Sequence, residues 1–331
     1  MSVRVGVVGL GHWGPNLARN FTTHGALVAL ADSRPDILGR LAAQYPGAKT
    51  FPDLESMLAA KVVDAVAIAT PAATHGALAA KALVAGLHVF VEKPLCLDLD
   101  EARALGTVAK GAGLILMVGH LLLYHPAFIA LQALVKTGRL GQLRYIYSNR
   151  LSLGKIRREE NALWSFAPHD VSMILALSGS VPSRAMTTGG SYLLSGVADT
   201  TLSHLAFRDG LQAHIFVSWL HPYKDHRLVV VGSEGMATFH DSEPEGRKLT
   251  LYPHAVGWDG EFPTVTKAAA EPLPYEAGEP LSLECQHFLD CVERRRTPRS
   301  DADESLRVLS VLDACQRSLS TGQPIELKVM I

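Results

Sequence analysis

The chain has 331 residues, of which 48% are hydrophobic and 19% charged, and its formal net charge is −1 at pH 7. This length predicts about two domains, and the composition is typical of a globular protein with a sizeable core. The balanced charge argues against nucleic acid or an anionic membrane surface as a partner, and no apolar run reaches the roughly 18 residues of a membrane span.

The amino terminus, MSVRVGVVGL, leads directly into a strand pattern without the basic and apolar regions of an export signal. The four cysteines form neither a CxxC pair nor a spacing typical of metal ligands. We therefore expect a reduced, cytoplasmic protein that binds no metal.

Residues 1–120 alternate short apolar runs with helical patterns. The expected strands are 3–9, 26–32, 48–51, 64–70, 88–92 and 114–119, and the expected helices are 13–24, 35–45, 53–60, 74–85 and 98–110. The strands are continuous runs of Val, Ala, Leu and Ile, as expected where helices cover both faces of a sheet. The pattern predicts an α/β fold whose first domain, residues 1–120, is a Rossmann-type doubly wound parallel sheet.

The segment GLGHWG fits the pattern G-x-G-x-x-G between the first strand and the first helix. Gly9, Gly11 and Gly14 would permit a tight turn and a close approach of a pyrophosphate to the helix N-terminus. His12 and Trp13 lie inside this loop and are expected at the cofactor. For Trp13, packing between the sheet and the helix explains the pattern equally well.

Asp32 ends the second strand, where a carboxylate accepts hydrogen bonds from the adenosine ribose hydroxyls and repels a 2′-phosphate. This favours NAD over NADP as the cofactor. Ser33 and Arg34 follow in the same turn and are expected to contact the cofactor. Arg34 can stack on adenine or receive a 2′-phosphate, so the preference for NAD is relative.

Thr70 and Pro71 lie at the carboxyl end of the fourth strand, and His75 lies at the start of the next helix. Ligands of open α/β sheets bind at the carboxyl edge of the strands, so we expect these three residues at the cofactor. Thr74, between them, is equally plausible as a helix cap.

The fifth strand, in HVFVEKPL (88–95), ends at the charged pair Glu92 and Lys93, and Pro94 fixes the direction of the chain after it. At the cofactor edge of the sheet, a partly desolvated lysine beside Glu92 can orient a substrate hydroxyl and favour its deprotonation. A solvated lysine at a strand end fits the pattern equally well.

The pattern changes after residue 121. A helix is expected over 126–137, a second helix after Pro168, and two amphipathic helices at 281–296 and 304–320. Alternating strand-like segments lie between them, namely QLRYIYSNRLSL, SRAMTTGGSYL, ADTTLSHLAF, LQAHIFVSWL, HRLVVVG, MATFHD and KLTLYP, and PIELKV ends the chain. Residues 121–331 are therefore predicted to form an α+β substrate-binding and oligomerisation domain with a large, open-faced, mainly antiparallel sheet.

Several segments carry a resemblance to a known family: GLGHWGPNLARN, ATPAATH, GSEGMATF and above all VEKPL. Over essentially its whole length the chain resembles the Gfo/Idh/MocA oxidoreductases. The resemblance implies nicotinamide-dependent oxidation or reduction of a sugar or polyol carbon, with Lys93 as the active-site lysine and Glu92 as a partner of the cofactor or the lysine. It also implies a homodimer or homotetramer built through the open sheet.

The family's second motif, D-x-G-x-H-x-x-D, corresponds here to SFAPHDVS (165–172). His169 falls on the family's catalytic histidine, whereas Ser165 and Ser172 stand at the positions of the two acids. The resemblance then implies that Lys93 and His169 share the proton chemistry, with Tyr124 or Asp170 assisting.

GHLLLYHPA (119–127), 147–170 and 218–232 are similar to oxidoreductases of nucleotide-sugar and lipopolysaccharide pathways. This implies NAD-dependent oxidation of a secondary hydroxyl, at C3, of a UDP-linked N-acetylamino sugar such as UDP-N-acetylglucosamine, with an aminotransferase acting on the keto product. The implied substrate-binding residues are Lys93, Tyr124, Arg150, Arg157, Asn161, Trp164 and His169.

Arg150, Lys155, Arg157, Arg158, Lys224 and Arg227 provide cations that could neutralise a diphosphate. For any single one of them a solvated position is the simpler interpretation. Two alternative functions stay open. One is a dehydrogenase of a free sugar or an inositol-like polyol, and the other is a non-catalytic NAD-binding regulatory protein.

Overall fold

The computed structural model describes residues 3–154 and 156–327, and the chain forms two compact units. Unit 1 contains Met1–Tyr124 and Glu279–Leu309, and unit 2 contains His125–Gly278 and Ser310–Ile331. The first unit thus contains the expected domain 1–120 and adds a second segment, Glu279–Leu309, which had been expected in the other domain. Lys155 lies outside the described residues.

Unit 1 is built on a six-stranded parallel sheet with the strand order β3-β2-β1-β4-β5-β6. The strands are β1 (Val5–Val8), β2 (Leu27–Ala31), β3 (Lys49–Phe51), β4 (Ala65–Ile68), β5 (His88–Glu92) and β6 (Leu116–Gly119). The strand order reverses between β1 and β4, and a ligand crevice is expected at the carboxyl ends of the strands at such a point. The predicted doubly wound sheet is confirmed.

Two helices of unit 1 begin at an aspartate that caps them. The side chains of Asp53 and Asp98 accept hydrogen bonds from Ser56 N at 2.7 Å and Glu101 N at 2.8 Å, at the starts of α3 and α5. The helical elements are α1 (Gly14–Thr23), α2 (Pro35–Gln44), α3 (Leu54–Ala59), η1 (Ala72–Thr74), α4 (His75–Val84), α5 (Leu99–Gly111), η2 (Leu121–Tyr124) and α8 (Pro280–Arg294).

A cluster of three aromatic rings explains why α8 belongs to unit 1. Phe288 of α8 packs edge to face on Phe21 of α1 and Phe90 of β5, with ring centroids 6.3 and 5.8 Å away. All three side chains are fully buried. Burial of an aromatic side chain is among the largest single contributions to a core, so this cluster fixes α8 on the sheet despite its distance in the sequence.

Unit 2 is built on a nine-stranded sheet with the order β16-β13-β12-β11-β7-β10-β9-β8-β17. The strands are β7 (Leu143–Leu153), β8 (Arg184–Gly190), β9 (Thr200–Ala206), β10 (Gln212–Ser218), β11 (Leu220–Gly232), β12 (Met236–His240), β13 (Leu249–Tyr252), β16 (Glu271–Pro272) and β17 (Ile325–Glu326). Only β7 and β10 pair in parallel among these neighbours, which confirms a mainly antiparallel sheet.

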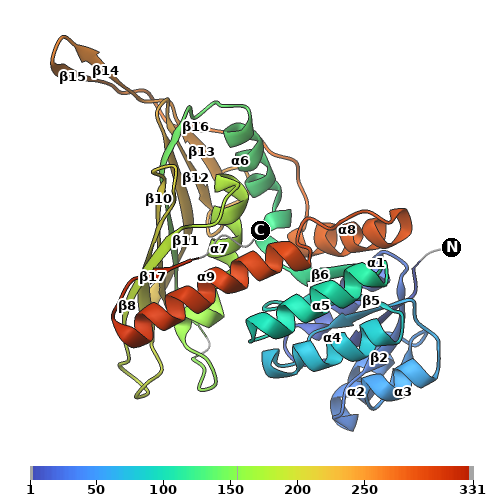
Figure 1. The fold of residues 1–331 in the computed structure, drawn as a ribbon. Helices are drawn as coiled ribbons and strands as arrows, with labels where there is room; N and C mark the ends of the chain where they lie inside the picture. The colour runs from blue at the N-terminus through green and yellow to red at the C-terminus, as the bar shows by residue number, and fades with distance from the viewer. Residues whose placement is uncertain (1–2, 155, 328–331) are drawn as a thin grey trace. The chain divides into compact units, whose positions relative to one another are not determined.

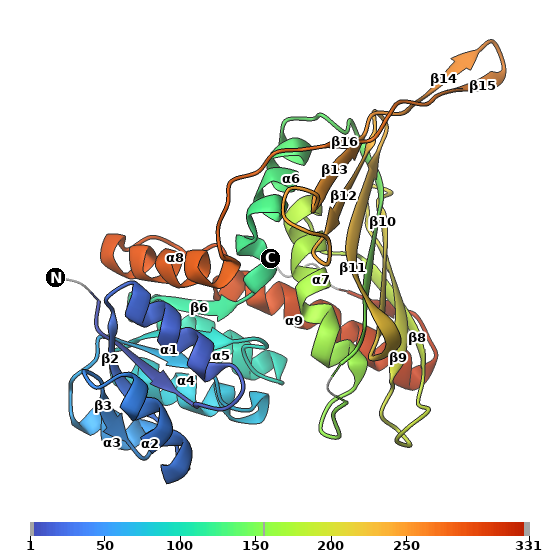
Figure 2. The same cartoon turned by 180° about the vertical axis from the view of Figure 1, so that it is seen from behind.

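Helices α6 (Pro126–Lys136) and α7 (Ala162–Ser178) lie on one face of this sheet (Figures 1 and 2). The later part of α9 (Ala302–Thr321) also belongs to this unit, where Ser318 Oγ accepts a hydrogen bond of 2.8 Å from Thr187 N of β8.

Alternate residues of the strands point to the other face of the nine-stranded sheet. There Tyr147 and His214 stack with centroids 5.1 Å apart, and Leu202 is 47% exposed.

The start predicted for α7 was wrong. The helix begins at Ala162 rather than after Pro168, because Asn161 caps it by accepting a hydrogen bond of 3.2 Å from Trp164 N. Pro168 therefore lies inside the helix, where its missing N–H leaves the Trp164 carbonyl without its usual donor.

Strands β14 (Ala255–Asp259) and β15 (Phe262–Thr266) form a separate hairpin that projects beyond the sheet (Figure 2). Every residue of the two strands is exposed. Neither this hairpin nor β16 was predicted from the sequence, because exposed strands lack the contrast between a buried and a polar face.

All four cysteines are buried free thiols. Within 3–154 and 156–327 no helix is long and apolar enough to cross a membrane. In the same ranges no cluster of His, Cys, Asp and Glu side chains could hold a metal ion.

Candidate active site

The glycine loop between β1 and α1 is shaped by close backbone contacts. Gly9 has a φ of +87°, and a Cβ atom on Gly14 would lie 2.0 Å from the carbonyl oxygen of Gly9. A Cβ on Gly11 would meet nothing nearer than Arg34 Nη2 at 3.7 Å, so the backbone there is open to an approaching group. This loop at a helix N-terminus fits the pyrophosphate of a dinucleotide.

Asp32, at the end of β2, is buried and fixed by several donors. Its carboxylate accepts hydrogen bonds from Leu10 N at 2.7 Å and from Arg34 Nε and Nη2 at 2.9 and 2.8 Å. The Arg34 guanidinium, more than backbone donors, lowers the pKa of Asp32 to about 2. The carboxylate is therefore ionised at neutral pH, as ribose recognition requires, while Arg34 partly offsets its repulsion of a 2′-phosphate. Ser33 is exposed in the same turn.

Replacing Asp32 with Ala should weaken NAD binding by about tenfold or more, because charge-assisted hydrogen bonds to the ribose are lost. NADP binding should weaken less, so discrimination between the two cofactors narrows. Titration calorimetry with both nucleotides measures this. Asp36→Ala, an exposed position in the first turn of α2, is the matched control. An unchanged ratio of the two affinities in the Asp32 variant would mean that another group recognises the ribose.

His75 joins two turns at the carboxyl edge of the sheet. Its Nδ1 lies 2.7 Å from the carbonyl oxygen of Pro94 and its Nε2 lies 2.8 Å from that of Thr70. The residue is only 1% exposed. His75 therefore ties the turn after β4 to the turn after β5, and it supports the position of Thr70 and Pro71 from within the protein.

Glu92 and Lys93 lie at the carboxyl end of β5, on the same edge as the glycine loop and Asp32. The carboxyl group of Glu92 packs on Gly119, where an added Cβ would lie 3.2 Å from Oε2. Burial raises the pKa of Glu92 to about 7, although Lys93 and Trp13 both act to lower it. The pair thus combines a cation with a carboxyl group that titrates near neutrality. His12 is exposed, while Trp13 is partly buried beside this pair.

Tyr124 is buried inside unit 1. Its hydroxyl lies 3.0 Å from Ser300 Oγ, and the Arg299 guanidinium lies over its ring, 5.0 Å from the centroid. Burial raises the pKa of the phenol well above its usual value. Tyr124 is consequently a neutral phenol engaged within unit 1, which favours a supporting role over proton transfer.

His169 lies on α7 of unit 2 and is partly buried. Ser172 donates a hydrogen bond of 2.9 Å to the backbone carbonyl of His169. Ser165 is buried one turn earlier on the same helix. The two serines thus occupy the acid positions of the motif without providing a carboxylate.

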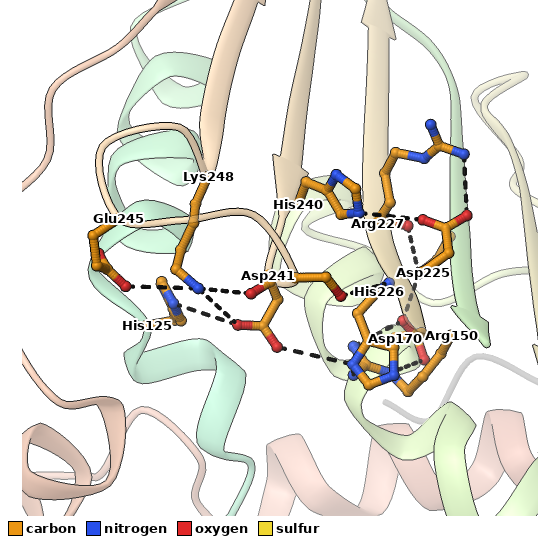
Figure 3. A network of polar contacts seen from close by, with 12 residues as sticks. His125, Arg150, Asp170, Asp225, His226, Arg227, His240, Asp241, Glu245 and Lys248 are labelled. Carbon is orange, nitrogen blue, oxygen red and sulfur yellow. Dashed lines mark hydrogen bonds and ion pairs between the residues drawn. The ribbon is translucent and has the colours of Figure 1, made fainter. Parts of the chain in front are cut away.

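The next residue, Asp170, is fully buried and binds Arg150 of β7 (Figure 3). Arg150 Nε and Nη2 donate to the two carboxylate oxygens at 2.7 and 3.2 Å, and Ser148 Oγ also donates to this carboxylate. Arg150 is only 6% exposed. Its charge is therefore already neutralised within unit 2, which argues against the predicted contact with a substrate diphosphate.

Figure 3 shows that this ion pair continues into a second group of charges around Asp241. Arg150 Nη1 lies 3.4 Å from His226 Nδ1, and Asp241 lies 3.9 Å from His226, 3.7 Å from His125 and 3.6 Å from Lys248. Burial acts to raise the pKa of Asp241, but His226 and Lys248 outweigh it and hold the pKa well below its usual value.

The remaining predicted substrate residues also have partners inside unit 2. Asn161 Nδ2 and Trp164 Nε1 both donate to Gln316 Oε1, at 2.8 and 3.1 Å. Arg157 forms an ion pair of 3.0 Å with Glu160, and Arg227 one of 3.1 Å with Asp225. Arg158 and Lys224 are exposed. Three of the six predicted cations, Arg150, Arg157 and Arg227, are thus paired with carboxylates.

Two features of the site were missed from the sequence. The first is the Arg150–Asp170 pair, and the second is Glu284 on α8, which is completely buried and whose pKa is raised by burial and, to a lesser extent, by the charge of Glu92. Glu284 lies in an amphipathic segment in which a glutamate is ordinarily a surface residue, so the pattern gave no signal.

Two family descriptions match this chain. Residues 3–120 match the oxidoreductase family with an NAD-binding Rossmann fold, and residues 128–238 match the GFO/IDH/MocA C-terminal domain. Together they span more than half of the chain. The first unit therefore carries an NAD-binding Rossmann domain, as predicted from the glycine loop and Asp32.

Named relatives cover nearly the whole chain. It is 28% identical to the UDP-N-acetylglucosamine 3-dehydrogenase of Acidithiobacillus ferrooxidans, across 93% of this chain and 94% of that protein. It is also 28% identical to the scyllo-inositol 2-dehydrogenase (NAD(+)) of Bacillus subtilis, across 99% and 97%. A solved structure of the Acidithiobacillus ferrooxidans enzyme superposes with a TM-score of 0.85 at 27% identity, covering 96% of this chain and 98% of that one.

Proposed function

The chain belongs to the Gfo/Idh/MocA family of oxidoreductases, and on that basis we propose that it oxidises a secondary hydroxyl, at C3, of a UDP-linked N-acetylamino sugar with NAD. UDP-N-acetylglucosamine is the substrate we favour. The similarity to a UDP-N-acetylglucosamine 3-dehydrogenase over more than nine tenths of both chains supports this choice.

The observation that carries the proposal is the position of Lys93. It follows β5 at the carboxyl edge of the NAD-binding sheet, beside a carboxyl group whose pKa is raised to about 7 by burial. Bound NAD supplies a hydride acceptor. We propose that Lys93 orients the substrate hydroxyl and takes part in the transfer of its proton. His169 of α7 shares this proton transfer, because an imidazole can accept and donate a proton near neutral pH.

A second candidate function is oxidation of a free sugar or an inositol-like polyol. Two observations favour it. Arg150, Arg157 and Arg227 are already paired with carboxylates, which reduces the charge left for a diphosphate. The chain also matches a scyllo-inositol 2-dehydrogenase over 99% of its length. A regulatory protein that binds NAD without turnover is a weaker alternative, because Lys93 and His169 are both present despite Ser165.

The proposed product is a keto sugar. We propose that an aminotransferase uses this product as its substrate in the next reaction. We also propose that the chain forms a homodimer or homotetramer through the uncovered face of the nine-stranded sheet, where Leu202, Tyr145 and Tyr147 present apolar surface. Size-exclusion chromatography with light scattering measures the assembly, and a monomer at micromolar concentration would contradict this part of the proposal.

The substrate is tested by incubating the protein with NAD and a panel of UDP-hexoses, free hexoses and inositols while NADH fluorescence is followed. Hydrazine is added to trap keto products, because oxidation of an alcohol by NAD is uphill at neutral pH. We expect NADH from UDP-N-acetylglucosamine. Turnover of inositols alone would favour the second candidate, and NAD binding without any turnover would favour the regulatory alternative.

A further inference from the structure

His75, the first residue of α4, lies between two turns at the carboxyl edge of the unit 1 sheet. Its Nδ1 is 2.7 Å from the carbonyl oxygen of Pro94, and its Nε2 is 2.8 Å from that of Thr70. Pro94 directly follows Lys93 in the turn after β5, and Thr70 lies in the turn after β4. One imidazole ring, in a residue that is 1% exposed, therefore faces two hydrogen-bond acceptors.

Both contacts require a donor from the ring. A carbonyl oxygen accepts hydrogen bonds and cannot donate them, a neutral imidazole carries one N–H donor and one acceptor nitrogen, and an imidazolium donates from both nitrogens. Only a protonated His75 can satisfy both carbonyls. A neutral His75 must leave one of them without its donor.

The surroundings of His75 disfavour the second proton. Burial lowers the pKa of His75 below its usual value of 6.5, the two carbonyl contacts act to raise it, and the charge of Lys93 acts to lower it. The other titratable groups on this side are Cys96, in the same turn as Lys93, and Glu101 of α5, whose carboxylate packs on Gly76. The ring is therefore mainly neutral at neutral pH and has a single N–H to donate.

Burial decides which carbonyl receives that N–H. Pro94 is buried, whereas Thr70 is partly exposed. A buried carbonyl oxygen without a donor bears the full cost of its lost hydration, while a partly exposed one can bind water instead. The proton of a neutral His75 is therefore expected on Nδ1, facing Pro94.

We propose that His75 is a positioning residue for Lys93, whose turn it holds by donating from Nδ1 to the carbonyl of Pro94. The contact of Nε2 with Thr70 becomes a hydrogen bond only when the ring gains its second proton. His75 acts through the turn and not by contact with the substrate. The inference deepens the proposed function and rests on it for the role of Lys93.

Two amide side chains separate the two contacts of the ring. The side-chain nitrogen of asparagine can take the place of Nδ1, and that of glutamine can take the place of Nε2. His75→Asn should therefore keep the donor that faces Pro94, whereas His75→Gln should lose it and supply a donor to Thr70 instead. A histidine with a merely structural role would give two variants with similar defects.

His75→Gln should lower kcat by about 10²-fold, because a displaced turn misplaces the reacting group that it carries. His75→Asn should keep kcat within about threefold of wild type, and both variants should keep the Kd for NAD within about tenfold. NADH fluorescence and calorimetric titration measure the two quantities. His24→Gln is the control, since His24 Nε2 lies 3.1 Å from the Ser282 carbonyl oxygen at the other end of α1. Equal kcat values in the two His75 variants would overturn the proposal.

The position of the proton is measured in the wild-type protein, so this test does not depend on the folding of a variant. Histidine rings are labelled with ¹⁵N, and long-range ¹H–¹⁵N correlations, assigned through the His75 backbone, distinguish Nδ1 from Nε2. We expect a proton on Nδ1 alone at neutral pH, and a second proton on Nε2 only below pH 6.5. A proton on Nε2 alone, or on both nitrogens at neutral pH, would overturn the assignment.

Stability reports the same protonation with a defined sign. Where the folded pKa of a histidine lies below the unfolded value, the unfolded chain binds more protons, and the protein loses stability as pH falls from 6.5 through the folded pKa. This loss should be absent from His75→Gln, which does not titrate. The Tm of the variant relative to wild type should therefore rise as pH falls through this window. A relative Tm that stays constant or falls would contradict a neutral ring. Circular dichroism shows whether the variant is folded.

The position of Lys93 is followed without substrate. Lysines are reductively methylated with ¹³C-formaldehyde, which preserves their charge, and the Lys93 signal is the one missing from Lys93→Met. Its chemical shift should move in His75→Gln and stay in place in His75→Asn, and an unmoved signal in His75→Gln would contradict the positioning role.

The two proposals fail in distinguishable ways. If the Lys93 signal moves as expected but no sugar or polyol is oxidised, the positioning role of His75 stands and the proposed function fails. If turnover occurs and His75→Gln is as fast as wild type, the proposed function stands and the positioning role fails.

Discussion

Lys93→Met is expected to lower NADH formation by at least about 10³-fold, while NAD still binds with an affinity within about threefold of wild type. Methionine preserves the unbranched stem of lysine but provides no group that can hold or pass a proton. Because Lys93 follows β5 at the cofactor edge of the sheet, its loss should remove proton transfer and leave the glycine loop and Asp32 in place. Fluorescence assays of NADH formation, with calorimetric titration of NAD, measure the two quantities.

Lys81→Met is the matched control for this variant. Lys81 lies on α4 of the same unit and forms a surface ion pair with Glu55. Its replacement should change neither activity nor NAD affinity, since exposed ion pairs contribute little. Undiminished turnover of the Lys93 variant would remove Lys93 from the reaction. A loss of NAD binding in parallel with activity would instead make it a cofactor ligand.

Arg150→Met should lower the free energy of unfolding of unit 2 by about 3–5 kcal/mol, because it leaves Asp170 as an unpaired charge in the interior. Both members of the pair are almost completely buried, with side-chain exposures of 7% and 0%. Urea unfolding followed by intrinsic fluorescence reports the change. If Arg150 instead served mainly to bind a substrate diphosphate, the variant would keep its stability and show a raised KM for nucleotide sugars.

The controls for Arg150 come from the same strand and from its partner. Arg144→Met, on the exposed part of β7, should alter the free energy of unfolding by less than about 0.5 kcal/mol. The double variant Arg150→Met, Asp170→Asn should recover part of the stability, since it removes the uncompensated charge as well as its partner. A double variant less stable than Arg150→Met alone would contradict the explanation by buried charge.

Much of the fold of unit 1 could be predicted because its strands are buried on both faces. The run HVFVE was predicted as a strand over 88–92, and β5 has those bounds. The start of α7 could not be located in the same way, because the cap at Asn161 competes in the sequence with Pro168. Strands β14 and β15 were missed because apolar residues such as Trp258 and Phe262 are exposed there without a buried face opposite.

The residues of the site also differ in whether local sequence or tertiary packing determines their position. Residues whose place follows from local geometry, such as Gly9 and Gly14 in the turn after β1 and Asp32 at the end of β2, could be located from spacing on a strand–turn–helix unit. The partner of Arg150 could not, because it is Asp170 of α7, a residue from another element of unit 2. Such pairing depends on tertiary packing, and a single sequence contains no periodic signal for it.

The most direct test of the central assignment is hydride transfer from a defined carbon. The protein, at a concentration above that of the sugar, is mixed with NAD and UDP-N-acetylglucosamine deuterated at C3, and the nicotinamide is analysed by mass spectrometry. A single turnover suffices, so the unfavourable equilibrium does not obscure the result. We predict deuterium on the reduced nicotinamide. Its absence, with transfer from a deuterated inositol under the same conditions, would contradict the proposed substrate, and absence of transfer from both would contradict dehydrogenase activity on these compounds.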